Sequence, residues 1–337
     1  MELKRYKEEI TLYDTEGNPK SSWVEIRVDP LTGEVSRVIN VPLREWSLPD
    51  LEAMARETRA SCPFCPEHLE NKTPKFAEAL LPGGTLGRGG ATLIPNLFPY
   101  DRYCALIILS KAHYVPLDAW KAREILDGLR LAQDFINRVS AYDTSVNAFA
   151  LNWNYAPHSG SSILHPHIQL SVGAFASNRG RRMMTAAYDA MLEGKEPMTE
   201  LLREERSRGE RWCGRIGPWN LLFAFAPRGR FFEFILMHEA TGCFPLLPEP
   251  DLKALSEGIV RGLRFVVTMG LSSMNLSLFS PLREEGIFHP MVSISPRACV
   301  GPHQMSDISF QMLIDEFFAL FLPEEVASRF RKSREGA

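Results

Sequence analysis

One short pattern occurs twice in the chain and constrains its fold more than any other feature. The segment LHPHIQLSVG begins at Leu164 and FHPMVSISPR begins at Phe288, and both join a His-Pro pair to alternating apolar residues and a serine. A pattern repeated in this way indicates two copies of one structural unit. We therefore predict that the 337 residues form two similar halves, residues 1–180 and 181–337.

The elements expected around the two copies follow the same order. In each half, strand, amphipathic helix, strand and loop precede the His-Pro strand. The first half carries the first three at 91–109, 118–139 and 148–153, and the second half at 231–237, 251–266 and 274–279. This order predicts an α+β protein in which each half is an antiparallel sheet with a packed helix.

Three further segments lie outside this repeat. Residues 24–39 alternate around a Pro- and Gly-containing turn and predict a β-hairpin. The charged, helix-favouring residues 181–211 are expected to connect the halves, and residues 329–337 to form a polar tail.

The charge balance and the distribution of apolar residues exclude several classes of protein. The 38 Lys and Arg residues against 41 Asp and Glu give a net charge of −3, without the basic excess that nucleic-acid binding usually requires. No apolar run reaches the ~18 residues of a membrane span, and the charged start MELKRYKEEI lacks the core of a signal peptide. We expect a cytoplasmic protein that binds neither nucleic acid nor membranes, with a homodimer as the commonest assembly.

Two groups of residues could carry chemistry. Strand alternation places His165, His167 and Gln169 on one side, where a neutral imidazole can attack phosphorus and an amide can bind a phosphoryl oxygen. The pair Cys62-Pro-Phe-Cys65 suits a metal or a redox site, but the strand-helix-strand context of a redox pair is missing. The first group predicts phosphoryl or nucleotidyl transfer, and the second predicts metal binding.

The HPHIQ motif and the loop at 154–162 resemble the active-site segment of galactose-1-phosphate uridylyltransferases and their relatives in the histidine-triad superfamily. The resemblance implies two histidine-triad-like halves, with His167 as the nucleophile that becomes nucleotidylated. It also implies that Gln169 steadies the transferred phosphoryl group. Ile168 departs from the family pattern, which typically has glycine there.

The resemblance further implies residues that bind the substrate. Those implied to line the nucleotide phosphates are Asn154, Gly160, Ser161 and Ser162. Asn96, in an Asn-x-Phe-Pro segment, is implied to approach the nucleoside, although it also fits an ordinary loop. Arg27 resembles a family arginine that could meet phosphate, and an ordinary strand arginine is equally compatible with the sequence.

A structural zinc ion is implied as the cofactor. Two thiolates and two imidazoles suit tetrahedral zinc, and the resemblance assigns Cys62, Cys65, His165 and His113 as its ligands. His68, within CPFCPEH, is the rival of His113 for the last position.

The second half departs further from the family. Met291 and Ser293 stand where the first copy has His167 and Gln169, so we predict one active centre per chain and no second metal site. The cations Arg283, Arg297 and His303 could bind the phosphate of an acceptor, or could be solvated surface residues.

The leading function is nucleotidyl transfer from a nucleoside diphosphate sugar, with UDP-glucose favoured, to a hexose 1-phosphate. The alternative within this chemistry is a phosphorylase, with inorganic phosphate as acceptor and an ADP-sugar or a dinucleoside polyphosphate as donor. A hydrolase, in which water resolves the nucleotidyl-histidine, and a nucleotide-binding protein without catalysis remain open. Dependence on an acceptor separates the transferases from the hydrolase.

Overall fold

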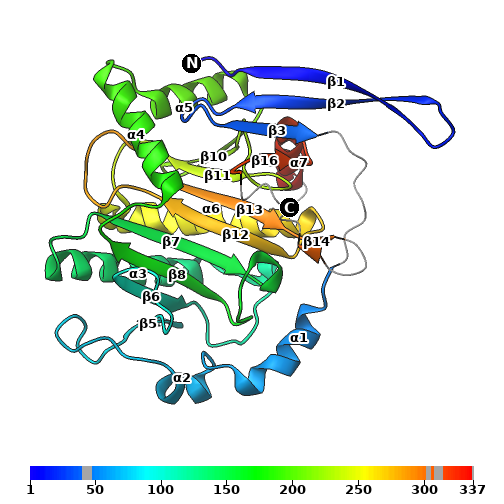
Figure 1. Cartoon of the computed structure of the whole chain (residues 1–337). Helices are drawn as coiled ribbons and strands as arrows, with labels where there is room; N and C mark the ends of the chain where they lie inside the picture. Colours follow the sequence, from blue (N-terminus) through cyan, green and yellow to red (C-terminus); the bar gives the residue numbers. More distant parts are fainter. Residues whose placement is uncertain (40–47, 301–304, 307–313, 336–337) are drawn as a thin grey trace.

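A fully antiparallel ten-stranded sheet forms the centre of the molecule (Figure 1). The computed structural model describes residues 1–39, 48–300, 305–306 and 314–335. The sheet order is β4-β5-β6-β8-β7-β12-β13-β11-β10-β9. The strands of the first half are β4 (Leu86–Arg88), β5 (Ala91–Pro95), β6 (Tyr103–Ile108), β7 (Ala148–Tyr155) and β8 (His167–Gly173). Those of the second half are β9 (Trp212–Ile216), β10 (Trp219–Phe223), β11 (Phe234–His238), β12 (Ser273–Phe279) and β13 (Met291–Arg297).

The strand order confirms the predicted duplication. Outward from the centre, β7-β8-β6-β5-β4 on one side matches β12-β13-β11-β10-β9 on the other. The register matches too, because Ile108 is opposite His167 in one half and Met237 is opposite Met291 in the other. One main-chain hydrogen bond beyond the strand ends is also equivalent in the two halves. The Leu109 amide donates to the Pro166 carbonyl at 3.1 Å, and the His238 amide donates to the Pro290 carbonyl at 2.9 Å.

The two halves share one sheet, whereas the sequence predicted a separate sheet for each. Strands β7 and β12 pair at the centre, with Asn152 opposite Ser277. These two residues occupy equivalent positions, opposite Gln169 and Ser293 respectively, so the pair lies on the pseudo-twofold axis. Separate sheets would have left two long edge strands with unpaired main-chain groups, and pairing across the axis satisfies them.

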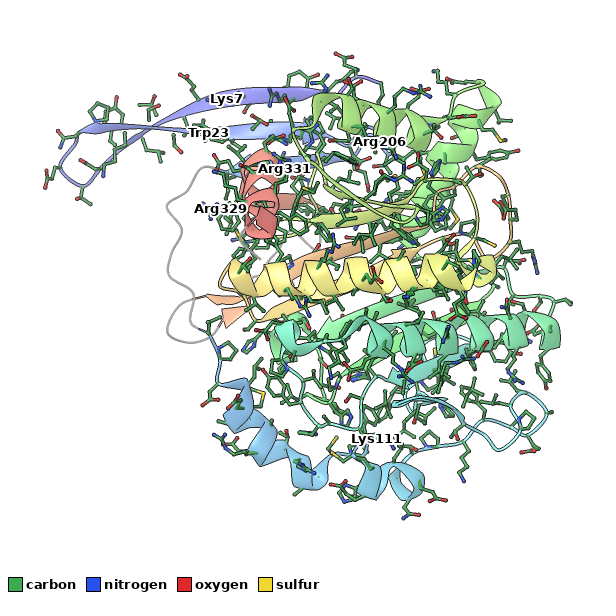
Figure 2. The ribbon with its side chains drawn as sticks, turned by 180° about the vertical axis from the view of Figure 1, so that it is seen from behind. Lys7, Trp23, Lys111, Arg206, Arg329 and Arg331 are labelled. Atoms are coloured by element: carbon green, nitrogen blue, oxygen red, sulfur yellow. The ribbon has the colours of Figure 1, made fainter. Side chains whose placement is uncertain are left out.

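Two long helices cover one face of the sheet, and Figure 2 shows them lying side by side across its back. They are α3 (Ala122–Tyr142) and α6 (Glu249–Thr268). The predicted helix 118–139 corresponds to α3, and most of its apolar positions from Ile125 to Val139 are buried against the sheet. The predicted first residues of the two helices are displaced, because Asp118 lies in a separate 3-10 turn (Leu117–Ala119) and Asp251 lies inside the first turn of α6.

The opposite face is covered differently in the two halves. In the first half, α1 (Leu51–Thr58) packs against the core on the α3 side and is followed by a 3-10 turn (Arg59–Ser61). The segment from Cys62 into α2 (Pro66–Lys72) packs on the opposite face, with Phe64 against Leu106 and Ile108 of β6. In the second half, α4 (Asn178–Leu192) and α5 (Pro197–Arg208) pack on it and form the charged connection that the sequence predicts. The predicted boundary at residue 180 falls inside α4.

A smaller sheet joins the two ends of the chain. It has the order β1-β2-β3-β16, with β1 (Arg5–Tyr13), β2 (Pro19–Val28), β3 (Val35–Ile39) and β16 (Phe317–Ala319). The pairing of β2 with β3 confirms the predicted hairpin at 24–39, and Figure 1 shows β1 and β2 extending from the body as a ribbon. A second, two-stranded sheet pairs β14 (Cys299–Val300) with β15 (Met305–Ser306).

The C-terminal segment corrects one prediction. Residues 329–335 of the predicted polar tail belong to α7 (Pro323–Glu335), which forms because Val326, Ala327 and Phe330 are buried against the second half. The last two residues of the predicted tail lie outside the described residues. Among the helices of the described residues, none combines the length and apolarity that crossing a bilayer demands.

Candidate active site and metal centre

Four side chains that are distant in the sequence meet beside the first half of the sheet. They are Cys62, Cys65, His113 and His165, all buried, with potential ligand atoms within 4.8 Å of one another. Cys62 and Cys65 precede α2, His113 follows β6, and His165 precedes β8. Within the described residues this is the one cluster of three or more such ligands. Two sulfurs and two ring nitrogens match the ligand set of tetrahedral zinc.

Hydrogen bonds on the far side of each ring orient the two histidines. His113 Nε2 lies 2.9 Å from Thr58 Oγ1, whose hydroxyl donates to the Met54 carbonyl, so the ring must donate to Thr58. His165 Nε2 likewise donates to the Ser110 carbonyl at 2.8 Å. The lone pair of each ring is therefore on Nδ1, 3.4 Å from Cys65 Sγ for His113 and 3.7 Å from it for His165. Metal-bound histidines usually donate a hydrogen bond from the other ring nitrogen in this way.

The pKa shifts of these side chains show which of them can coordinate a metal ion directly and which need a cation nearby. Burial and the neighbouring Cys62 raise the pKa of the Cys65 thiol to about 12, and burial lowers the pKa of His165 to about 4. Neutral imidazoles are ready to coordinate, and the thiols need a nearby cation to ionise. His68 does not join the cluster, since its Nδ1 donates to the Cys62 carbonyl at 2.9 Å. The four residues could hold a metal, and their donors fit zinc.

His167, the first residue of β8, is arranged as a nucleophile. Its side chain is 6% exposed, and its Nδ1 donates to the His165 carbonyl at 2.8 Å. Burial lowers the pKa of His167 below the ordinary 6.5, so the ring is neutral near pH 7 with its lone pair on Nε2. The ring of Phe64, between the two cysteines, packs edge-on against it with centroids 5.2 Å apart. The cysteine segment thus contacts His167 through Phe64.

Amide side chains surround His167 on the same face of the sheet. Alternation along β8 places His167 and Gln169 on this face and Ile168 in the core under α3, as predicted. Asn152 is directly opposite Gln169 on β7. Asn154 is the next residue on this face of β7, at the level of His167. The strands therefore gather one imidazole and three amides.

The loop after β7 brings the predicted phosphate-binding residues to the edge of this group. A 3-10 turn (Pro157–Ser159) ends at Gly160, whose φ of +91° suits glycine. Gly160 and Ser162 are exposed, whereas the Ser161 hydroxyl donates to the Ile163 carbonyl at 2.7 Å. The Ser161 side chain thus shapes the loop from inside.

Two predicted substrate contacts lie elsewhere in the described structure. Arg27 is completely buried and bonds Glu25, Glu324 and the Phe225 carbonyl, where the N- and C-terminal segments meet. Its guanidinium is committed to these internal pairs, and its phosphate role stays a prediction. Asn96 follows β5, two strands from β8, where its Oδ1 accepts from the Phe98 amide at 3.0 Å.

The cations of the second half separate. Arg283 bonds Asn147 and the Val146 carbonyl at one end of β7, whereas Arg297 bonds Asn275 near the other end. His303 lies outside the described residues.

Sequence reasoning missed three participants. Asn152 was detectable, because it stands two positions before Asn154 on the same predicted strand. Phe64 carried a signal only through its place between the cysteines. Asn275 carried none, because its relation to Asn154 depends on the pairing of β12 with β7.

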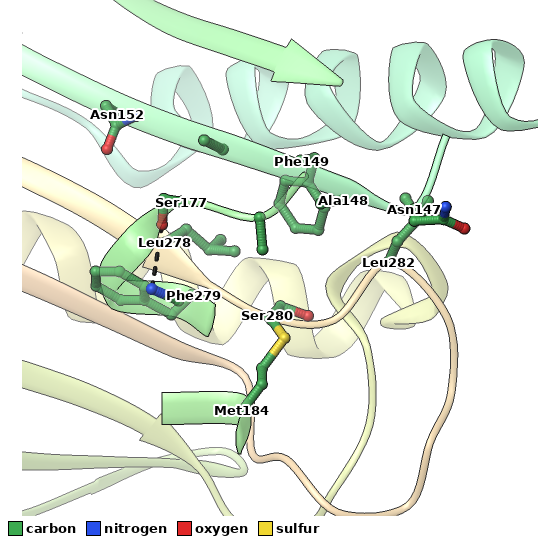
Figure 3. Close-up of a pocket in the computed structure, with 13 residues that line it drawn as sticks. Asn147, Ala148, Phe149, Asn152, Ser177, Met184, Leu278, Phe279, Ser280 and Leu282 are labelled. Carbon is green, nitrogen blue, oxygen red and sulfur yellow. Dashed lines mark hydrogen bonds between the residues drawn. The ribbon is translucent and has the colours of Figure 1, made fainter. Parts of the chain in front are cut away.

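A pocket opens on the same face of the sheet (Figure 3). It lies where β7 and β12 meet the start of α4, and Figure 3 shows Asn152 on its edge with Ser177 and Met184 on its α4 side. Since Asn152 is opposite Gln169, the pocket adjoins the group around His167.

Comparison with known proteins gives relatives in sequence and in fold. No protein-family model matches the chain. An uncharacterised protein of Archaeoglobus fulgidus is 31% identical over 319 residues, which cover 94% of each chain. At this identity and coverage the two proteins belong to one family.

Solved structures identify the fold. A galactose-1-phosphate uridylyltransferase-like protein and an ADP-glucose phosphorylase, both from Arabidopsis thaliana, each match with a TM-score of 0.70 and 19% identity, over 91% of this chain and 98% of theirs. A uridylyltransferase matches with a TM-score of 0.68 and 18% identity, over 92% and 98%. The chain thus belongs to one family with the Archaeoglobus fulgidus protein and has the same fold as the galactose-1-phosphate uridylyltransferase-like proteins of known structure.

Proposed function

We propose that this protein transfers a nucleoside monophosphate between phosphate-bearing molecules through a covalent bond to His167 Nε2. The observation that carries the proposal is the hydrogen bond from His167 Nδ1 to the His165 carbonyl, 2.8 Å long. It places the ring proton on Nδ1 and the nucleophilic lone pair on Nε2. Burial keeps that ring uncharged near neutral pH.

The reaction divides into two displacements. His167 Nε2 attacks the α-phosphorus of a nucleoside diphosphate sugar, the bond to the bridging oxygen breaks, and the sugar 1-phosphate leaves. A phosphate oxygen of the acceptor then attacks the same phosphorus, and the N–P bond breaks to restore neutral His167. The His165 carbonyl stabilises the positive charge that the ring gains meanwhile, and the Gln169 amide donates to a phosphoryl oxygen.

Zinc, held by Cys62, Cys65, His113 and His165, would have a structural role in this scheme. Bound there, it would supply the positive charge that keeps the two thiolates ionised. The protein's own residues do the rest: the backbone of His165 orients the nucleophile, and Phe64 packs against it.

Two substrate pairs are proposed. UDP-glucose with a hexose 1-phosphate is favoured by the similarity of the HPHIQ segment to uridylyltransferases. An ADP-sugar with inorganic phosphate is the second candidate, supported by the equally extensive fold match to an ADP-glucose phosphorylase.

The test is the intact mass of the protein after mixing with UDP-glucose or ADP-glucose without acceptor. Wild type should gain one nucleoside monophosphate, and His167→Gly should gain none. The donor that labels identifies the base. Labelling of His167→Gly would contradict the proposed nucleophile, and continuous release of sugar phosphate without acceptor would indicate a hydrolase.

A further inference from the structure

The second half contributes an asparagine to the first-half site. Asn275, on β12, is directly opposite Asn154 on β7 and bonds its side chain. We propose that Asn275 is a positioning residue that turns the Asn154 side chain so that its NH₂ group faces the substrate. The inference rests on the proposed function and names how a second-half residue prepares the nucleotide site.

Three hydrogen bonds determine which way the Asn275 amide points. Its Nδ2 lies 2.9 Å from the Ser159 carbonyl oxygen and 2.8 Å from Asn154 Oδ1. Its Oδ1 accepts from Arg297 at 2.9 Å. A carbonyl oxygen only accepts and a guanidinium only donates, so both contacts require the same orientation. A flipped amide would place two oxygens together on one side and two donors together on the other.

The orientation of Asn154 follows from that of Asn275. Both Nδ2 protons of Asn275 are used, so Asn154 must present its oxygen to Asn275 and turn its own NH₂ group away. No residue in the described part of the chain accepts a hydrogen bond from Asn154 Nδ2. Asn154 is level with His167 on the neighbouring strand, so an NH₂ group turned away from Asn275 would suit the oxygens of an anionic phosphate at His167.

The same asparagine also holds the loop that follows Asn154. The loop begins at Ala156, whose φ of +69° is uncommon for a residue other than glycine and has to be maintained by its surroundings. Two residues of β12 bond this region. Asn275 donates to the Ser159 carbonyl, and Ser273 Oγ donates to the Tyr155 carbonyl at 2.7 Å. The second half thus anchors the start of the loop.

Asn275→Asp is the informative substitution because it keeps the shape and removes the donors. A carboxylate cannot donate to Asn154, so the Asn154 amide would have to reverse and present its oxygen to the substrate phosphate. Asn220 offers a matched control on β10. Its Nδ2 donates to the Met237 carbonyl and its Oδ1 accepts from Arg206, so it too joins a main-chain carbonyl to an arginine, although its other Nδ2 partner is the Glu239 carboxylate. Asn220→Asp therefore reports the cost of this change to the fold alone.

The experiment measures the second-order rate constant of labelling by UDP-glucose and ADP-glucose for Asn275→Asp, Asn154→Ala, the double variant and Asn220→Asp. Asn275→Asp should label about 10- to 100-fold more slowly than wild type. In the Asn154→Ala background the same change should cost clearly less than in wild type, because the effect through Asn154 is gone and only the lost hydrogen bond to the Ser159 carbonyl remains. Asn220→Asp should label within about twofold of wild type.

Wild-type labelling of Asn275→Asp would overturn the inference, as would an undiminished loss in the Asn154→Ala background or an equal loss in Asn220→Asp. If wild type is not labelled by either donor, the proposed function fails separately. The inference is then judged by calorimetric affinities for UMP and AMP, in which the same non-additive loss is expected and its absence refutes it.

Discussion

Equivalent positions on one face of the sheet have different chemical surroundings in the two halves. His165 in the first half and His289 in the second both precede a proline whose carbonyl accepts the same strand-end bond. Around His165 are the two cysteines and His113. Around His289, the start of α5 takes their place: Thr199 Oγ1 lies 3.1 Å from Nε2, and Met198 Sδ lies 3.4 Å from the main-chain nitrogen.

The difference extends to the next side chain on that face. His167 stands at the edge of a group of amides, whereas Met291 is 3% exposed and packs with Met183 and Met198 beneath α4 and α5. The main-chain ladders are the same in both halves, because strand pairing makes few demands on side chains. The comparison teaches that the two halves share one backbone arrangement, while different covering elements give equivalent positions different surroundings.

Breaking the metal centre should have the largest effect. Cys62→Ser should reduce bound zinc from about one ion per chain to near zero and lower the free energy of unfolding by about 4 kcal/mol or more. Elemental analysis and urea denaturation measure the two quantities. The buried Cys213 in the second half is the control, and Cys213→Ser should keep the metal. Retention of zinc by Cys62→Ser would contradict the assigned ligands.

A histidine placed at Met291 tests whether α4 and α5 keep substrate away from the second copy of the motif. In a His167→Gly background, Met291→His should gain no nucleotidyl label, because α4 and α5 bury the position. A polar ring without a partner there should lower the free energy of unfolding by about 1–3 kcal/mol. Intact mass and urea denaturation provide the readouts. A labelled double variant would show that the second half is open to substrate.

The buried ring of His289 predicts a dependence of stability on pH. Burial lowers its pKa below 6.5, against the opposing hydrogen bond to the His238 carbonyl. Below pH 6.5 the unfolded ring binds a proton that the folded ring resists, so this contribution is present above pH 6.5 and lost as the pH falls. His289→Gln should therefore remove up to about 1.4 kcal/mol of the difference in unfolding free energy between pH 7.5 and pH 5.5.

Urea denaturation at the two pH values measures this difference. An unchanged difference in His289→Gln would mean that the ring titrates alike in the folded and unfolded chains.

The link between the metal centre and the nucleophile should give the smallest effect. Phe64→Leu keeps an apolar side chain but removes the ring that packs edge-on against His167. Such a contact is worth about 1 kcal/mol, so labelling should slow by about fivefold while the zinc content stays unchanged. A rate equal to that of wild type would show that the ring contributes nothing to the placement of the nucleophile.

The sequence predicted best where chemistry is local. The HPHIQ strand specified which side chains share a face, and the order of elements around the two His-Pro copies specified the duplication. It predicted less well where a residue's partner is remote. For Arg27 the sequence left a phosphate contact and an ordinary strand arginine equally open, because the partner that the structure gives it, Glu324, is 297 residues away. Residues 329–337 were read as a tail because their own composition is polar, while the burial that makes α7 a helix comes from the second half.

By itself, the sequence predicted the two halves, the shared face of His165, His167 and Gln169, and the cysteine pair, because alternation along a strand and short spacings act over a few residues. Only the tertiary structure decided that both halves share one sheet, that His113 and not His68 joins the cysteines, and that Asn275 orients Asn154. These depend on pairing β7 with β12 and on packing α1 and α2 beside β8. No local pattern carries that information, since the residues involved meet only when remote strands satisfy each other's main-chain hydrogen bonds.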